Sequence, residues 1–78
     1  MVGFKKERFR QALRFKDYDR AKEVLREMEP WMTISDYDDV ARIIKEEAPW
    51  YDVEERGGEV RVDGITVDKW RGKIKIED

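Results

Sequence analysis

Hydrophobic residues recur at helical spacing through the first two thirds of the chain and alternate with polar residues in the last third. Near the N-terminus, Phe9, Ala12 and Leu13 form one apolar stripe, which predicts a helix over about residues 4–15. On a continuous helix the stripe that follows would point about 120° away from this one. We therefore expect the helix to break near residues 15–19, so that both stripes can face one core.

Two further segments, DYDRAKEVLREMEPW and DYDDVARIIKEEAPW, nearly repeat each other. Each begins with acidic residues, continues with apolar residues at helical spacing, and ends in a Pro-Trp pair. Proline lacks the N–H that a helix needs and disfavours helical backbone at the residue before it. Pro30 and Pro49 should therefore end two similar helices, over about residues 17–29 and 35–48. An ancient duplication and two neighbouring helices with similar caps both explain the likeness.

Acidic and hydroxyl residues stand where these two helices should begin. Asp17 is expected to cap the first helix, and Ser35 or Asp36 the second, because such side chains accept hydrogen bonds from the free N–H groups. A capping role also accounts for the acids near residue 36. They lack the spacing and the glycine of a calcium-binding loop, so we expect no metal site there.

From residue 50 onward, apolar and polar residues alternate, which is typical of strands with one buried face. Gly57-Gly58 and Asp63-Gly64 suit two-residue hairpin turns. With those two turns, opposite charges face each other on one side of the sheet and valines on the other. The expected pairs are Arg56 with Glu59, Glu54 with Arg61, Val60 with Val67, and Val62 with Ile65.

A third turn signal, Arg71-Gly72, fits this pattern less well. A two-residue turn there would pair Val67 with Ile76 on the buried face and direct Trp70 to the opposite side. Either a bulge brings Trp70 back toward the core, or its ring is exposed.

These elements predict a single α+β domain, in which a three-helix bundle is followed by a small antiparallel β-meander over about residues 50–77. In element order and size the chain resembles the winged helix-turn-helix family. The resemblance implies that helix 17–29 positions the protein on DNA, that helix 35–48 reads the major groove, and that a hairpin serves as the wing.

Composition narrows the possible functions. The chain has no Cys and no His, so disulfides, thiolate metal sites and the commonest general base are excluded, and we expect neither an enzyme nor a cofactor. Charged residues make up 46% of the chain, whereas Asn is absent and Gln and Ser occur once each. This bias is typical of proteins that work at high temperature. With no apolar run near 18 residues and no signal-peptide pattern, we expect a cytoplasmic protein.

The charges are unevenly distributed, although the net charge is only −2. Residues 1–16 carry six basic residues and one acid, and residues 33–60 carry nine acids and three basic residues. Such segregation indicates either a partner of one sign or two elements that face each other within the fold.

Two basic patches are candidate nucleic-acid contacts, since the exposed side of helix 35–48 is slightly acidic and should be repelled by DNA. The helix-1 patch is Lys6, Arg10 and Arg14, and the hairpin patch is Lys69, Trp70, Arg71 and Lys73. Cations around an aromatic ring can hold phosphates and stack on a base. The alternatives are that the helix-1 cations neutralise helix 35–48 and that the hairpin lysines are simply a solvated sheet face.

A protein-interaction module or a homodimer is the second functional hypothesis. Phe4 and Phe15 lie on a side of the first helix away from Phe9 and Leu13. They either pack under the sheet, which we favour, or form a surface for a protein partner.

Overall fold

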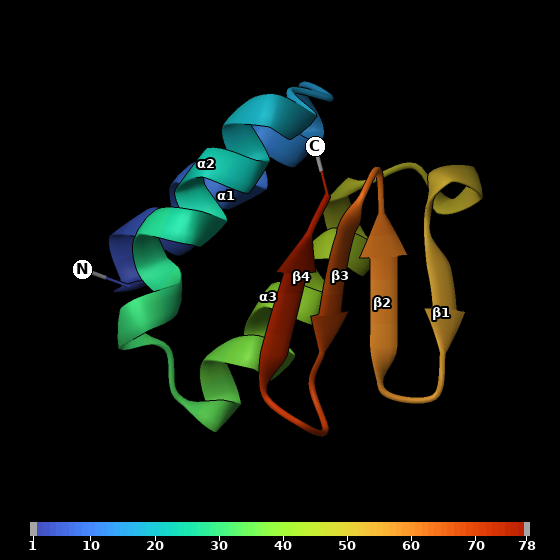
Figure 1. Cartoon of the computed structure of the whole chain (residues 1–78). Helices are drawn as coiled ribbons and strands as arrows, with labels where there is room; N and C mark the ends of the chain where they lie inside the picture. Colours follow the sequence, from blue (N-terminus) through green and yellow to red (C-terminus); the bar gives the residue numbers. More distant parts are fainter. Residues whose placement is uncertain (1, 78) are drawn as a thin grey trace.

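The computed structural model describes residues 2–77 and contains three helices followed by a four-stranded antiparallel sheet (Figure 1). This confirms the α+β class and the helix-then-meander order predicted from the sequence. Within this range no helix is both long enough and apolar enough to cross a membrane. The elements are α1 (Val2–Arg14), α2 (Tyr18–Met28), η1 (Glu29–Trp31), α3 (Ile34–Glu47), η2 (Trp50–Asp52), β1 (Glu54–Arg56), β2 (Glu59–Val62), β3 (Ile65–Asp68) and β4 (Lys73–Ile76).

The break between α1 and α2 falls where the two apolar stripes require it. Lys16 adopts the left-handed conformation, with φ of 57°, and its N–H donates to the carbonyl of Leu13 at 3.0 Å. The N–H of Asp17 donates to the carbonyl of Ala12 at 2.8 Å, which completes a Schellman motif. Lysine is an unusual residue at this position, because glycine adopts it without a steric cost.

The predicted cap of α2 is confirmed, and that of α3 is wrong by a few residues. Asp17 Oδ1 accepts the backbone N–H of Arg20 at 3.2 Å. The N-cap of α3 is Thr33, not Ser35 or Asp36. Asp36 instead occupies the third helical position, and its carboxylate accepts the N–H of Thr33 at 2.7 Å. A capping box of this kind begins the helix earlier than a single cap at Asp36 would.

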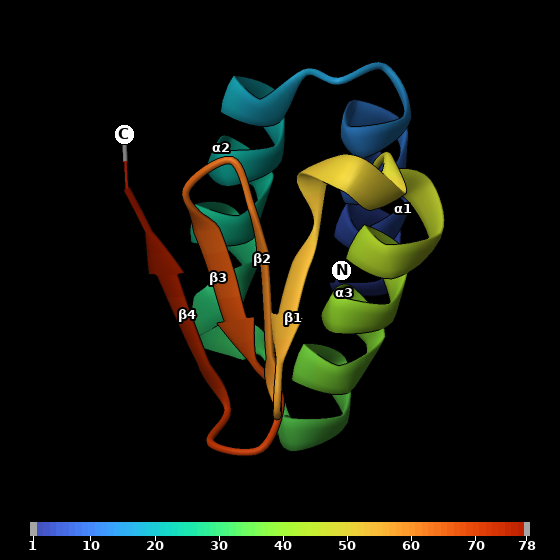
Figure 2. The ribbon, with the colours of Figure 1, turned by 90° about the vertical axis from the view of Figure 1, so that its right-hand side faces the viewer.

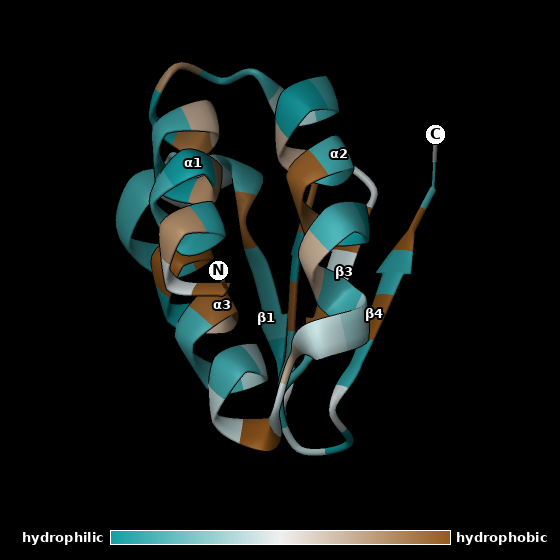
Figure 3. Ribbon diagram, turned by 90° about the vertical axis from the view of Figure 1, so that its left-hand side faces the viewer, coloured by the Kyte–Doolittle hydropathy of each residue, from teal (hydrophilic) through white to brown (hydrophobic). Residues whose placement is uncertain are grey.

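The helices cover one face of the sheet and leave the other face open (Figure 2). α1 packs against α2 and α3, while α3 also packs against β2 and β3. Hydrophobic positions lie where the helices face each other and the sheet, and hydrophilic ones line the outer sides of α1 and α2 (Figure 3). The largest fully buried side chains are Phe9, Leu13, Leu25, Met28, Val40 and Ile44 from the helices and Val60, Val62, Ile65 and Val67 from the sheet.

The first two hairpins have the predicted register. Arg56 pairs with Glu59, and Val62 pairs with Ile65. Both turns contain residues with positive φ, namely Gly57 in the first and Asp63 and Gly64 in the second. Because residues on one strand alternate between faces, this register directs every valine and isoleucine of β2 and β3 toward the helices.

The third hairpin differs from the prediction. Val67 pairs with Ile74 instead of Ile76, because the turn has four residues, Lys69–Gly72, rather than two. Asp68 organises this turn: its Oδ1 accepts the N–H groups of Trp70 and Arg71 at 3.1 and 3.0 Å. Its carbonyl accepts the N–H of Gly72 at 2.9 Å. Trp70 therefore belongs to the turn and not to a strand.

Candidate nucleic-acid interface

The helix-1 patch faces the acidic side chains of α3. Lys6 Nζ lies 2.6 Å from Asp36 Oδ1 and 2.9 Å from Asp39 Oδ2. Arg10 Nη1 lies 2.6 Å from Glu47 Oε2. One helical turn further along α1, the guanidinium of Arg14 donates to the same carboxylate, with Nε 3.0 Å from Oε1. The two helices are therefore joined along their length by ion pairs.

These contacts shift the pKa of several groups. The pKa of the Glu47 carboxyl is lowered, because hydrogen bonds from Arg14 and Arg10 stabilise its charged form. The pKa of Asp36 is lowered in the same way by Lys6 and by the N–H of Thr33. Burial lowers the pKa of Lys6, but its hydrogen bonds to Asp36 and Asp39 raise the pKa by more, so the net shift is upward.

Of the two explanations for the uneven charge distribution, the structure supports two elements that face each other. The cations of residues 6, 10 and 14 meet acids of residues 36, 39, 46 and 47. The helix-1 patch and the hairpin patch also do not form one surface. α1 lies on the far side of the helical layer, away from the open face of the sheet (Figures 1 and 2).

The hairpin patch has far weaker internal pairing. Across the part of the chain that the structure describes, neither Lys69 nor Lys73 forms an ion pair. Arg71 reaches Asp68 only at 3.8 Å, and its side chain is largely exposed. Exposed pairs at this distance contribute little. The cations of the hairpin patch are therefore available to a partner, whereas those of the helix-1 patch are engaged in ion pairs with α3.

Trp70 projects from this turn, and 73% of its surface is exposed. One face of its indole covers the β1–β2 turn, so closely that a Cβ on Gly58 would lie 2.5 Å from Trp70 Cδ2 and 2.6 Å from Cγ. The N–H of Lys69 donates to the carbonyl of Gly58 at 3.0 Å, which ties the two turns together. One face of the indole thus lies against the backbone of the β1–β2 turn. Because most of the side chain is exposed, the opposite face is open to solvent.

Sequence reasoning missed Gly58 and Asp68 as supports of Trp70. The signal for Asp68 was its position four residues before a glycine, since Asp accepts hydrogen bonds from the residues that follow it in turns. Contact between Gly58 and Trp70 had no local signal, because it depends on two hairpin turns at the same end of the sheet.

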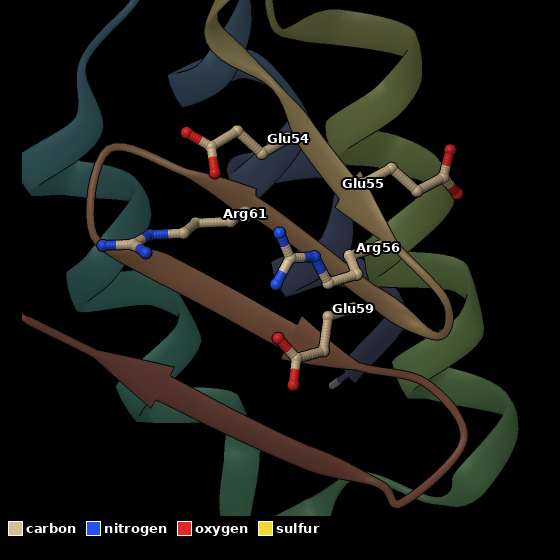
Figure 4. A pocket seen from close by; sticks show the side chains of 5 residues that line it. All are labelled: Glu54, Glu55, Arg56, Glu59 and Arg61. Carbon is tan, nitrogen blue, oxygen red and sulfur yellow. The ribbon is translucent and has the colours of Figure 1, made fainter.

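The open face of the sheet continues from the hairpin patch and carries only polar and charged side chains. On β4 it presents Lys73 and Lys75, of which Lys75 lies 3.6 Å from Glu77. On β1 and β2 it presents Glu54, Arg56, Glu59 and Arg61, which line a shallow pocket together with Glu55 (Figure 4). Within residues 2–77 none of the first four forms an ion pair.

Positive charge is concentrated on the β3–β4 half of this face. There Lys69, Arg71, Lys73 and Lys75 accompany two carboxylates, Asp68 and Glu77, and the second lies 3.6 Å from Lys75. The β1–β2 half is balanced, with two arginines and two glutamates. A polyanion would therefore be attracted to the β4 edge.

α3, the expected recognition helix, lies between α1 and the sheet (Figure 2). Its two exposed cations are engaged: Arg42 Nη2 lies 2.9 Å from Asp38 Oδ2, and Lys45 Nζ lies 3.0 Å from Glu55 Oε2. The helix therefore presents no excess of positive charge to a DNA groove.

Phe4 and Phe15 are both exposed, so the expectation that they pack under the sheet is wrong. α1 packs on the other helices, and the rings of Phe4 and Phe15 remain largely exposed to solvent. The guanidinium of Arg8 lies 4.8 Å from the ring centre of Phe4. Arg8 also lines a shallow pocket with Phe15, so both rings remain candidates for a partner surface.

Other large apolar side chains are exposed at both ends of the molecule. Trp31 is the last residue of η1, and Ile34 is the first residue of α3. A Cβ on Gly72 would lie 3.0 Å from Ile34 Cδ1, so this end adjoins the β3–β4 turn. At the opposite end the rings of Trp50 and Tyr51 meet edge to face, with 5.9 Å between their centres.

Comparison of the chain with known protein families, with curated proteins and with solved structures gave no match. In the described range, acidic side chains do not gather in groups of three or more that could hold a metal ion. The candidate site is therefore defined by its own geometry: an exposed indole that lies on the β1–β2 turn and belongs to a β3–β4 turn whose cations form few ion pairs.

Proposed function

We propose that this protein binds nucleic acid through the hairpin patch and the adjoining outer face of β4. The observation that carries the proposal is the position of Trp70, exposed and seated on Gly58, between Lys69 and Lys73, which form no ion pair within the described chain. In the winged helix-turn-helix family, which the chain resembles in element order and size, a hairpin also contacts nucleic acid. Here the hairpin becomes the main contact, and the helix-1 patch is assigned to ion pairs with α3.

Two interactions would supply the affinity. Lysine and arginine side chains neutralise phosphates and release counterions, which makes binding strongly dependent on salt. Stacking of a base on an aromatic ring contributes about 1–3 kcal/mol. Because Lys69, Arg71 and Lys73 flank Trp70 in the sequence, at the β3–β4 turn and the start of β4, one short segment of nucleic acid can make both interactions at once.

The test is a triple substitution, Lys69→Ala, Arg71→Ala and Lys73→Ala, measured by fluorescence anisotropy with labelled oligonucleotides at low and moderate salt. We expect binding to weaken at least about tenfold and its salt dependence to become shallower. The matched control is Arg8→Ala, Lys16→Ala and Arg20→Ala, which removes the same charge from α1, α2 and the turn between them. Unchanged affinity in the hairpin variant, or an equal loss in the control, would remove the hairpin from the site.

A protein-interaction role has separate support. Ile34 is exposed beside the β3–β4 turn, Trp31 is exposed three residues before it, and Phe4 is exposed on α1. Exposed apolar groups of this size are typical of contact surfaces. If the protein is a homodimer built on α1, light scattering should detect a stable dimer, and Phe4→Glu should dissociate it.

We also infer a cytoplasmic protein that works at high temperature. Ion pairs become less costly as temperature rises, because the hydration of charges weakens. The pairs between α1 and α3 form a connected network through the shared carboxylate of Glu47, which is the arrangement that benefits most. A melting temperature above about 90 °C would agree with this inference, and one below about 65 °C would contradict it.

A further inference from the structure

We infer that the nucleic acid recognised is single-stranded, with an unpaired base stacked on the open face of Trp70. This inference rests on the proposed function and narrows it. Three features of the structure lead to it: the one-sided exposure of the indole, the engagement of α3 within the fold, and the line of cations along β4.

The indole of Trp70 has one face available, not two. Gly58 lies against the other face, near ring atoms Cγ, Cδ2 and Cε3. A side chain that wedges between stacked base pairs must expose both faces of its ring, or an apolar edge, to the bases above and below. A ring seated on backbone can accept one base, and bases that are free to turn toward it are found in single strands.

The element that would read a duplex is engaged elsewhere. α3 is packed between α1 and the sheet, and its acids Asp36 and Glu47 bind cations of α1. Major-groove reading requires a helix that can enter a groove about 12 Å wide with its side chains free. On the exposed side of α3 the cations Arg42 and Lys45 are already paired with Asp38 and Glu55, so this helix offers a duplex no unpaired positive charge.

The cations on β4 suit a flexible strand. Lys73 and Lys75 are two residues apart on the same face, which separates their Cα atoms by about 6.8 Å. Together with Lys69 and Arg71 they extend from the turn along the sheet edge. A single strand can follow this short line, with phosphates beside the lysines and a base turned toward Trp70. The balanced charges of β1 and β2 would not extend the site further.

The experiment uses Trp70 as its own reporter. Trp31→Phe and Trp50→Phe leave it as the only tryptophan of the chain. This variant is titrated with oligothymidylate, with oligouridylate, and with a duplex of equal length and mixed sequence. We expect either single strand to bind at least about tenfold more tightly than the duplex and to quench the emission of Trp70. Tighter binding of oligothymidylate than of oligouridylate would indicate a preference for DNA, and the reverse a preference for RNA.

Substitution of the ring then tests stacking. Trp70→Ala, made in the otherwise unaltered chain, should weaken single-strand binding about 5- to 150-fold, as expected for loss of one stacked base. Trp50→Ala, which removes another exposed tryptophan at the opposite end of the molecule, should change it less than about twofold. Circular dichroism of each variant confirms that the fold is retained.

The outcomes separate the two proposals. Duplex binding that equals or exceeds single-strand binding, and that still depends on Lys69, Arg71 and Lys73, overturns the single-strand inference and leaves the proposed function standing. Single-strand binding without quenching of Trp70 overturns the stacking geometry. If no nucleic acid binds at low salt, the proposed function fails and the inference fails with it.

Discussion

Trp70 and Gly58 are in contact face to backbone, so the residue at one hairpin turn limits what can stand at the other. A Cβ at position 58 would lie within 3 Å of three atoms of the indole. No ordinary side chain fits in that space unless the ring moves. The two turns, twelve residues apart in the chain, therefore form one structural unit at the end of the sheet.

Gly58→Ala should displace Trp70 without unfolding the domain. The ring is a side chain at the surface and can rotate away, so we expect the free energy of unfolding to fall by about 1 kcal/mol or less, at the low end for overpacking. In the variant with Trp70 as the only tryptophan, its emission should shift to longer wavelength. Once Trp70→Ala has removed the ring, adding Gly58→Ala should cost no further stability. If Gly58→Ala costs as much in that background as in the natural sequence, the two residues are not coupled.

Lys16→Gly should stabilise the protein. Lys16 holds a left-handed conformation at the end of α1, with φ of 57°, which glycine adopts more readily. Lys16→Ala removes the same hydrogen bond to Tyr51 but keeps the Cβ, so it is the matched control. We expect the glycine variant to melt about 4–8 °C above the alanine variant in differential scanning calorimetry. Equal melting temperatures would mean that this backbone position carries no strain.

Stability should fall in acid, and Glu47 should contribute to the fall. The pKa of its carboxyl is lower in the folded chain, because hydrogen bonds from Arg14 and Arg10 stabilise the charged form. The stabilisation is therefore complete above the unfolded pKa of about 4.3 and is lost as the pH falls through the lower folded value.

Urea unfolding between pH 7 and about pH 2 measures this effect. Glu47→Gln should be less stable than the natural sequence at pH 7, and the difference should shrink toward pH 2. Glu23→Gln, which removes an exposed acid of α2 with no ion pair among the described residues, should leave the pH profile nearly unchanged. A Glu47→Gln curve parallel to that of the natural sequence would argue against the ion pairs.

Asp68→Ala should loosen the third turn. It removes the carboxylate that accepts the N–H groups of Trp70 and Arg71, at a cost of about 1–2 kcal/mol for the lost hydrogen bonds. Asp68→Asn keeps an acceptor oxygen and should lose less. Hydrogen exchange of the amides of residues 70 and 71 reports the change directly, and unaltered protection in Asp68→Ala would contradict this account of the turn.

The third turn also shows what an alternating pattern can and cannot determine. Pairing Val67 with Ile76, as predicted, or with Ile74, as found, places the same residues on the buried face, because the two registers differ by two residues. Alternation therefore sets which face is buried, and the length of the turn sets the register. In the first two hairpins, Gly-Gly and Asp-Gly indicated two-residue turns, so the buried face and the register were both predictable.

The candidate site was only partly predictable, for a different reason. The sequence shows that residues 6, 10 and 14 are basic and that α3 is acidic, but the direction in which two helices face each other depends on packing. The same holds for Phe4 and Phe15, whose exposure follows from α1 lying outside the contact with the sheet. The hairpin patch could be proposed from the sequence because turn residues are local.

β4 forms one edge of the sheet, and its unpaired backbone groups could bind the same strand of another copy. Lys73 and Lys75 oppose that association, since two copies brought edge to edge would set lysines against lysines. The side chains that would attract a polyanion are thus also the ones that prevent self-assembly into ribbons. If the proposed function holds, a bound polyanion would cancel this repulsion between neighbouring copies.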